Sequence, residues 1–156
     1  MASPSPLLFV VPMPPNVTNR GARASNNWRQ VYCDKKAYCA SLDLIATCRR
    51  FATNSGIAYT IPPVPSAPFD RATIHSTMYL GNAMDDDNAM ARHKHVLDWI
   101  RRAGYLVDDK KKHLRWLDLP QQVVKRGQTY RIELILTPEL SGRPRCAVDV
   151  RPLNTP

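Results

Sequence analysis

The sequence predicts an α/β fold of the mixed α+β kind, in which a small mixed sheet of about four strands is covered by two main helices. Two observations support this class. Short apolar or β-branched segments of strand length occur along the chain, and two longer segments place apolar residues at the spacing of one helix face. The predicted order is strand, helix, strand, helix, strand, strand. A chain of 156 residues is also long enough to bury a core as a single domain.

The first strand and the first helix are predicted in the N-terminal third of the chain. Leu7 to Val11 is apolar and is closely followed by three prolines, which predicts a strand that runs into a loop. Residues 16–30 contain several Asn and Arg residues and show no periodicity, so they are predicted to be a loop. From about Asp34 to Thr53 apolar residues recur at helical spacing, and Gly56 follows as a stop signal. This segment is the first predicted helix.

The middle of the chain predicts a strand followed by a second helix. Four prolines between positions 62 and 68 interrupt regular structure and indicate a stiff connector. Arg71 to Leu80 is rich in β-branched and aromatic residues, which is typical of a strand. From about Ala89 to Ala103 the apolar residues cover one half of a helix, and Gly104 supplies the C-terminal stop. His93 falls in the apolar half, so we expect it to face the core.

Two more strands are predicted between the second helix and a C-terminal tail. His113 to Leu119 and Tyr130 to Thr137 have strand composition, and the second alternates apolar with charged residues. After Pro138 the composition changes to Gly, Pro, Arg and polar residues. We therefore divide the chain into a folded domain over residues 1–138 and a loosely held tail over residues 139–156.

The chain is strongly basic. A formal net charge of +9 and a sequence pI of about 9.7 favour a polyanionic partner, with nucleic acid first. No apolar run near the start has the length to span a bilayer, and the features of a signal peptide are absent, so we expect no membrane partner and predict a cytoplasmic location. The four cysteines contain no CxxC pair, which indicates reduced thiols. The four histidines show no ligand spacing and are interpreted as structural.

Residues 85–88, with the sequence Asp-Asp-Asp-Asn, form an acidic cluster in this basic chain. Residues 55–88 contain one Arg against four Asp, whereas residues 1–54 and 89–127 together contain 17 Lys and Arg against six acidic residues. Adjacent carboxylates repel one another unless a cation offsets the repulsion, and a hard divalent metal such as Mg²⁺ does so best. Carboxylates loaded with metal inside a basic surround are what an enzyme that cuts a polyanion needs.

The spacing of these acids suggests which of them share a metal. In an extended segment Asp85 and Asp87 point to the same side and Asp86 to the other, so the first and third are the predicted metal pair. Asp87 or Asn88 suits the N-cap of the second helix, whose positive end faces the same place. Counted in helical turns from Asp87, Lys94 lies within about 20° on the polar side, where it can reach a bound phosphate.

Further residues complete a motif that resembles a known family. After the second helix comes an acid pair in a loop, which reaches the acidic cluster only if tertiary packing brings it there. The arrangement resembles the RusA family of Holliday-junction resolvases, which includes RusA-like endonucleases of phages and prophages, over roughly residues 7 to 137. The residues that carry the resemblance are Asp85-x-Asp87-Asn88, Lys94, Ala103-Gly104-Tyr105 and Asp108-Asp109, with Pro12-Met13-Pro14-Pro15-Asn16 near the start.

The resemblance implies an activity and an assembly. The metal-binding catalytic acids of the family correspond to Asp85, Asp87 and Asp109, and its catalytic lysine corresponds to Lys94. These residues would hold Mg²⁺, with Mn²⁺ as an alternative, and hydrolyse phosphodiester bonds as an endodeoxyribonuclease. Branched DNA is the implied substrate, and a homodimer is implied because resolving a four-way junction takes two matched incisions. No small-molecule cofactor is expected.

Two assignments stay open within this resemblance. Arg92 is a rival for Lys94, because the interval from Asn88 to Lys94 is longer than in compact family members. Asn88 and Asp108 match supporting positions of the family. Whether Asp86 or Asp108 also binds metal is left open by the sequence.

Basic side chains outside the motif are predicted to hold the DNA. They lie in the N-terminal loop and in a run beside the second acid pair, and they are Arg20, Arg23, Arg29, Lys110, Lys111, Lys112 and Arg115. Simpler interpretations exist, since Lys94 can pair weakly with Asp98 and an acidic run before a helix can serve only as its cap. The alternative functions are a DNA-binding accessory protein without catalysis and a metal nuclease that acts on flaps or forks.

Overall fold

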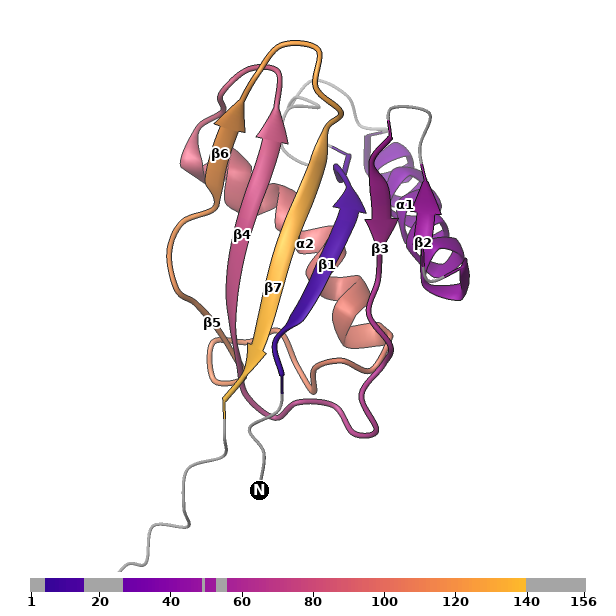
Figure 1. The fold of residues 1–156 in the computed structure, drawn as a ribbon, viewed down its shortest axis with the longest axis vertical. Helices are drawn as coiled ribbons and strands as arrows, with labels where there is room; N and C mark the ends of the chain where they lie inside the picture. Colours follow the sequence, from indigo (N-terminus) through magenta and orange to yellow (C-terminus); the bar gives the residue numbers. More distant parts are fainter. Residues whose placement is uncertain (1–4, 16–26, 49, 53–55, 140–156) are drawn as a thin grey trace, which may run out of the picture.

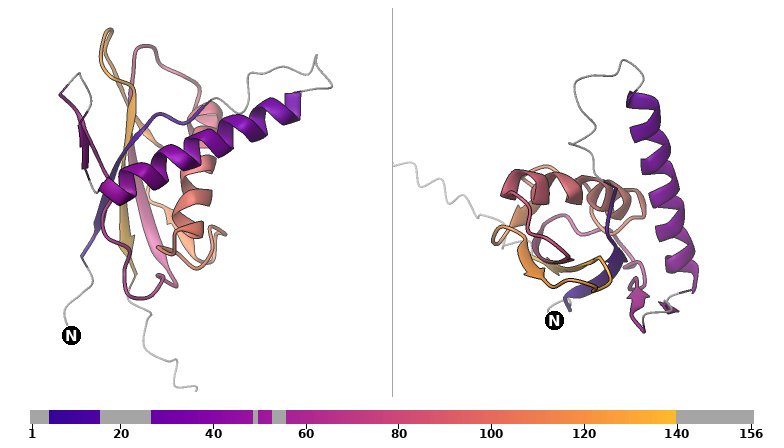
Figure 2. Two further views of the ribbon diagram at one scale, coloured as in Figure 1. Left: turned by 90° about the vertical axis from the view of Figure 1, so that its right-hand side faces the viewer. Right: turned by 90° about the horizontal axis from the view of Figure 1, so that it is seen from above.

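The computed structural model describes residues 5–15, 27–48, 50–52 and 56–139, which form one mixed sheet with two helices (Figure 1). Both helices lie on the same face of the sheet, and no described element covers the other face (Figure 2). The predicted class, a mixed α/β fold with two helices on one sheet, is confirmed. The elements in chain order are β1 (Leu7–Pro12), α1 (Asn27–Cys48), β2 (Arg50–Ala52), β3 (Ala58–Thr60), β4 (Ala72–Leu80), α2 (Asp86–Arg102), β5 (Leu114–Trp116), β6 (Gln121–Val124) and β7 (Arg131–Pro138).

The sheet has seven strands rather than about four. Its order is β2-β3-β1-β7-β4-β5, and β6 also pairs with β4. The antiparallel strands β1, β7 and β4 form its long centre, whereas β5 and β6 run parallel to β4 along one side. The prediction missed β2, β3 and β6, because strands of three or four residues are too short to show a clear alternation.

Alternation along the central strands builds the core. In β7, Ile132, Leu134 and Leu136 are fully buried, while the residues between them point to the open face. They belong to a core cluster that also contains Val96 and Ile100 of α2. This cluster holds α2 on the sheet, so β4 and α2 together form a fixed frame for the segments at their ends.

A buried polar pair also ties α2 to β4. His93 is fully buried, as its place on the apolar half of the helix predicts. Its Nδ1–H donates to the carbonyl of Ala89 at 2.7 Å, so Nε2 accepts the hydroxyl of Ser76 at 2.7 Å. Trp116 packs edge-on against the imidazole, with ring centroids 5.0 Å apart. Burial lowers the pKa of His93 to about 4, so the ring is neutral at physiological pH.

The predicted bounds of α1 are wrong at both ends. The helix starts at Asn27, inside the segment 16–30 predicted to be a loop. Its N-terminal half extends away from the sheet (Figure 2), and residues 31–37 include no buried side chain, so this part shows no apolar face that would indicate a helix. The helix ends at Cys48 rather than near Thr53, because β2 follows almost directly.

The predicted ends of α2 are partly correct. The helix begins at Asp86, slightly before its predicted start. Its N-cap is Asp85 and not Asp87 or Asn88, and the side chain of Asp85 makes no capping hydrogen bond. Gly104 has a φ of +88°, the left-handed conformation that favours glycine, and the chain leaves the helix there as predicted.

Three further expectations concern the described residues. Neither of the two described helices is long and apolar enough to cross a membrane. Cys33, Cys39 and Cys48 form no disulfide with a described residue, and Cys146 lies outside the described residues, so the predicted reduced state stays a prediction. The predicted tail, residues 139–156, lies outside the described residues except for Glu139.

Candidate functional site

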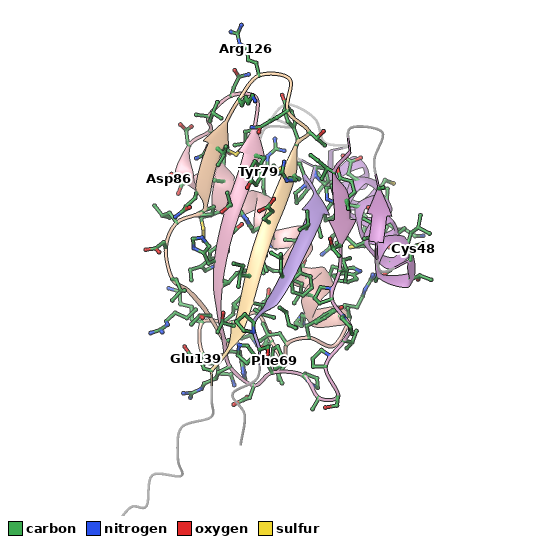
Figure 3. All side chains as sticks on the ribbon, viewed as in Figure 1. Cys48, Phe69, Tyr79, Asp86, Arg126 and Glu139 are labelled. Atoms are coloured by element: carbon green, nitrogen blue, oxygen red, sulfur yellow. The ribbon has the colours of Figure 1, made fainter. Side chains whose placement is uncertain are left out.

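The acidic cluster lies where β4 passes into α2, and Figure 3 shows Asp86 there. Its three aspartates are exposed. The loop before them is fixed by Gln122 of β6, whose side chain accepts a hydrogen bond from the N–H of Met84 at 2.9 Å and donates one to the Met84 carbonyl at 2.8 Å. β6 and α2 therefore hold the three carboxylates at one end of the sheet.

The three aspartates do not alternate as predicted. Asp86 and Asp87 belong to the first turn of α2, and Asp85 is the N-cap. The prediction that Asp85 and Asp87 share one side of an extended segment is wrong, because successive helical residues point about 100° apart. Among the described residues, no ion pair involves any of the three. Their mutual repulsion is offset in part by the N–H groups at the start of α2.

The second acid pair lies in the segment after α2 and is arranged differently. Asp108 accepts a hydrogen bond from the N–H of Asp109 at 2.9 Å and pairs with Nζ of Lys110 at 3.1 Å. The hydrogen bond from Lys110 is the main cause that lowers the pKa of Asp108 to about 2. This acid therefore has a cationic partner within its own loop.

Within a single chain, Asp109 lies far from Asp85 and Asp87. β5 pairs in parallel with the start of β4, so α2 returns the chain to the end of the sheet where β4 begins. Leu106, just before the second acid pair, forms a bridge with Phe69 at that end. α2 has 17 residues, which corresponds to about 25 Å between its ends. Figure 1 shows the segments before and after α2 at opposite ends of the sheet.

The predicted metal site of Asp85, Asp87 and Asp109 is therefore not formed within a single chain. In the part of the chain that the structure describes, no group of three or more His, Cys, Asp or Glu side chains is placed to hold a metal ion. The sequence indicates that a helix separates the two acid pairs, but it does not indicate that the next strand is parallel to β4. That pairing is the physical reason for the separation.

The two candidate cations of α2 differ in position. Lys94 is exposed and lies about 10 Å along the helix axis from the acidic cluster. Asp98, which the simpler interpretation of the sequence pairs with Lys94, instead pairs with Lys35 of α1.

Arg92 is partly buried, and its Nη1 donates to the carbonyl of Pro14 at 3.1 Å, beside the loop that leads into the acidic cluster. Burial lowers the pKa of Arg92. It lines a cavity of about 160 Å³ with Met13, Leu80, Gly81, Asn82, Met84 and Tyr130.

Most of the basic run after α2 gathers at the end of the sheet where β4 begins. Lys110 is held by Asp108, and the remaining members surround a cavity of about 270 Å³, which we call the basic pocket. Arg71 was not predicted to be a site residue, because only the parallel pairing of β4 with β5 places it beside the lysine run. The basic pocket is lined by Arg71, Ala72, Lys111, Lys112, His113, Arg115 and Glu139.

The predicted DNA-binding residues of the N-terminal loop are outside this description. Arg20 and Arg23 lie outside the described residues. Arg29 lies in α1, but its side chain is not among those described. Their predicted contact with DNA stays a prediction.

No protein-family model matches the chain, and no curated protein matches it. The resemblance to the RusA family is therefore carried by the motif residues alone. Of these, the acidic cluster and the second acid pair are the residues whose chemistry matters most, and the structure places them at opposite ends of α2.

Proposed function

We propose that the protein is a Mg²⁺-dependent, RusA-like endodeoxyribonuclease that resolves four-way DNA junctions in the cytoplasm. One observation carries the proposal: three adjacent aspartates are exposed at the start of α2, without an ion pair among the described residues, in a chain of net charge +9. Such carboxylates are the oxygen ligands that hard divalent metals prefer. The excess of positive charge elsewhere favours a polyanionic substrate.

The proposal requires two copies of the chain. In one copy the acidic cluster and Asp109 lie at opposite ends of α2, so a complete site needs Asp109 of the partner subunit. The side of the sheet formed by β5 and β6 runs between these two ends. It carries exposed apolar side chains, which favour association with a second copy, and these are Leu117, Leu119, Val123 and Val124.

The symmetry of such a dimer would join the separated acids. A two-fold axis that crosses the β5–β6 side at right angles to the strands reverses the strand direction in the second copy. The acidic cluster of each subunit then lies at the level of the second acid pair of the other, and the dimer contains two equivalent sites. Two sites match the two incisions that junction resolution needs.

In each site the metal would be held by Asp85, Asp87 and Asp109 of the partner subunit, with Mn²⁺ as an alternative to Mg²⁺. When bound, the metal supplies an activated water and neutralises charge on the phosphate. The chain itself adds positive charge for the transition state through Arg92 or Lys94. The carbonyl of Pro14 holds Arg92 beside the acidic cluster, whereas Lys94 lies nearly two helical turns away from it.

A panel of DNA substrates tests the proposal. Four-way junctions, flaps, forks and linear duplex are incubated with the protein in Mg²⁺ or in EDTA and separated on gels. We expect cutting of the four-way junction in Mg²⁺ only. Asp87→Asn should abolish cutting and keep junction binding, because it removes a metal ligand and no positive charge. Asp43→Asn is the matched control and should cut normally, because the amide oxygen can still accept the hydrogen bonds that Asp43 receives from Trp99 and Arg102 of α2. Cutting by Asp87→Asn at the wild-type rate would refute the catalytic assignment.

A DNA-binding accessory protein without catalysis is the second candidate. The separation of the acids within one chain favours it, and so does the basic pocket, since neither needs a metal. If no substrate in the panel is cut, the accessory role is the better conclusion. If flaps or forks are cut in preference to junctions, the protein is a metal nuclease with a different substrate.

A further inference from the structure

Three hydrogen bonds, two of them between backbone groups, fix the walls of the basic pocket, at the end of the sheet opposite the acidic cluster. The N–H of Ala72 donates to the carbonyl of His113 at 2.8 Å, and the N–H of Glu139 donates to the carbonyl of Arg71 at 2.9 Å. Nδ1 of His113 donates to the carbonyl of Asp70 at 2.7 Å. The start of β4, the turn before β5 and the residue after β7 are thereby joined into one frame.

The pocket has more cationic than anionic side chains. Arg71, Lys111, Lys112 and Arg115 line it, and Glu139 is the one carboxylate among its lining residues. Oε1 of Glu139 lies 3.2 Å from Nη2 of Arg115, but the two side chains are 36% and 69% exposed, so this ion pair is weak. The carboxylate of Glu139 therefore neutralises only part of the positive charge of the pocket, whose lining side chains keep a net positive charge.

We propose that the basic pocket binds a phosphate group, which displaces the carboxylate of Glu139 from Arg115. A phosphate offers more acceptor oxygens than a carboxylate, and guanidinium groups match its geometry. The pocket volume of about 270 Å³ is several times that of one water, about 30 Å³, so a tetrahedral phosphate fits. The ligand chemistry is a phosphate oxyanion, either in a nucleic-acid backbone or free. This binding uses no metal and no residue of the acidic cluster, so it stands or fails separately from the proposed nuclease activity.

DNA binding without metal tests the pocket. A fluorescently labelled four-way junction is titrated with the full chain in EDTA at several salt concentrations. The double variant Arg71→Gln, Arg115→Gln should lose about tenfold in affinity and should lower the slope of log affinity against log salt by about one. The control double variant Lys125→Gln, Arg126→Gln removes the same charge at the opposite end of the sheet (Figure 3) and should lose less than about threefold. Equal losses in the two double variants would overturn the proposal.

Glu139→Gln tests the pocket in the opposite direction. Without the carboxylate, Arg115 has no competing anion, so the affinity for the junction should rise about threefold. Asp43→Asn removes the same charge and also releases an arginine, Arg102, but it does so on α1 away from the pocket, and it should change the affinity by less than about 1.5-fold. Poor folding of the variant would lower the affinity, so it cannot produce this rise. Binding by Glu139→Gln no tighter than that of Asp43→Asn would contradict the proposal.

NMR titrations separate a backbone phosphate from a free one. Inorganic phosphate should move the amide signals of residues 111–115, whereas chloride at equal ionic strength should not. If a short single-stranded oligonucleotide moves the same signals at a concentration at least about tenfold lower, the backbone is the source of the phosphate. If the oligonucleotide and inorganic phosphate act at equal concentrations, the source is a free phosphate. Both results support the pocket, and an equal response to phosphate and chloride would overturn it.

Discussion

The two ends of the sheet both contain acids, but they differ in how those acids are paired. Where β4 passes into α2, three exposed aspartates have no ion pair among the described residues. Where β4 begins, Asp108 is paired with Lys110 and Glu139 with Arg115. The end with the acidic cluster can therefore bind an added cation, whereas the end with the basic pocket has an excess of cationic side chains that can bind an added anion. A cluster of acids alone does not indicate a metal site, and the two ends differ in that the described residues form no ion pair with the acidic cluster.

This difference suggests a division of tasks in the proposed dimer. The acidic cluster would supply most of the metal ligands, and the basic pocket would hold DNA. Because Lys111 follows Asp109 closely in the chain, a phosphate bound in the basic pocket would lie near the metal site to which that subunit contributes Asp109. The bound phosphate would then be a neighbour of the one that is cut.

Mixing two inactive variants has the largest expected effect and tests whether the two ends meet between subunits. Asp87→Asn and Asp109→Asn should each be inactive alone. In a mixed dimer one site contains both substitutions and the other contains neither, so an equal mixture should regain roughly a quarter of the wild-type sites. The regained activity should appear on gels as single nicks in the junction and not as paired cuts.

The matched control for this mixture is Asp85→Asn with Asp87→Asn. Both substitutions lie at the same end of the subunit, so every site in that mixed dimer is altered and no activity should return. Native mass spectrometry establishes that the subunits exchange. An inactive Asp87→Asn and Asp109→Asn mixture, with exchange established, would refute the shared site.

Acidification should weaken the core that joins the two ends. The unfolded chain protonates His93 near pH 6.5, whereas the folded protein does so only near pH 4, because burial disfavours the charged ring. The stability that depends on neutral His93 is therefore fully present above pH 6.5 and falls as the pH drops toward 4. The loss reaches up to about 3 kcal/mol, and urea unfolding at pH 7.5 and pH 4.5 measures most of it.

His93→Gln is the matched variant for the pH dependence. A neutral amide cannot take up the proton, so this variant should be less stable at pH 7.5 but should lose less stability on acidification. His95 remains in the variant, and because burial also lowers its pKa, it keeps a smaller loss in the same direction. Equal losses in wild type and variant would show that His93 is not the group responsible.

The buried elements of the fold are predictable because an element that buries one side places apolar residues at regular intervals along the sequence. β4, α2 and β7 each bury one side, and their predicted ranges agree closely with the observed ones. The first residues of α1, Asn27 to Gln30, fall in the segment predicted to be a loop, and residues 31–37 include no buried side chain. The short strands β2, β3 and β6 have too few residues for any period to appear.

The candidate site is predictable only where its signals are local. The aspartates of the acidic cluster lie at a helix start, as predicted, because acids in a first turn are a local helix signal. The place of Asp109 depends on the parallel pairing of β4 with β5, and no local pattern contains that information. For the same reason Arg71 was not predicted to belong with the lysine run.

Loss of Gln122 should affect the acidic end and spare the basic end. Gln122→Ala removes both hydrogen bonds to Met84 and should lower the free energy of unfolding by about 1–2 kcal/mol. Cutting in Mg²⁺ should weaken, because the loop before the acidic cluster is no longer held, whereas binding of the junction in EDTA should stay unchanged. Gln121→Ala, an exposed neighbour on the same strand, should do neither. Reduced junction binding in EDTA would contradict the division between the ends.

Gly104 determines where the chain turns from α2 toward the basic end, and its replacement has the smallest expected effect. At a φ of +88° an added Cβ costs about 1 kcal/mol, and it would meet Cγ1 of Val64 at 3.7 Å, an ordinary contact that adds little. Gly127 has a φ of +76° and no atom within 4 Å of an added Cβ, so Gly127→Ala should lose the same stability as Gly104→Ala in urea unfolding. Only Gly104→Ala should also weaken junction binding in EDTA, because the turn after α2 leads to the lysines of the basic pocket. Equal binding by the two variants would show that the basic pocket keeps its shape without that turn.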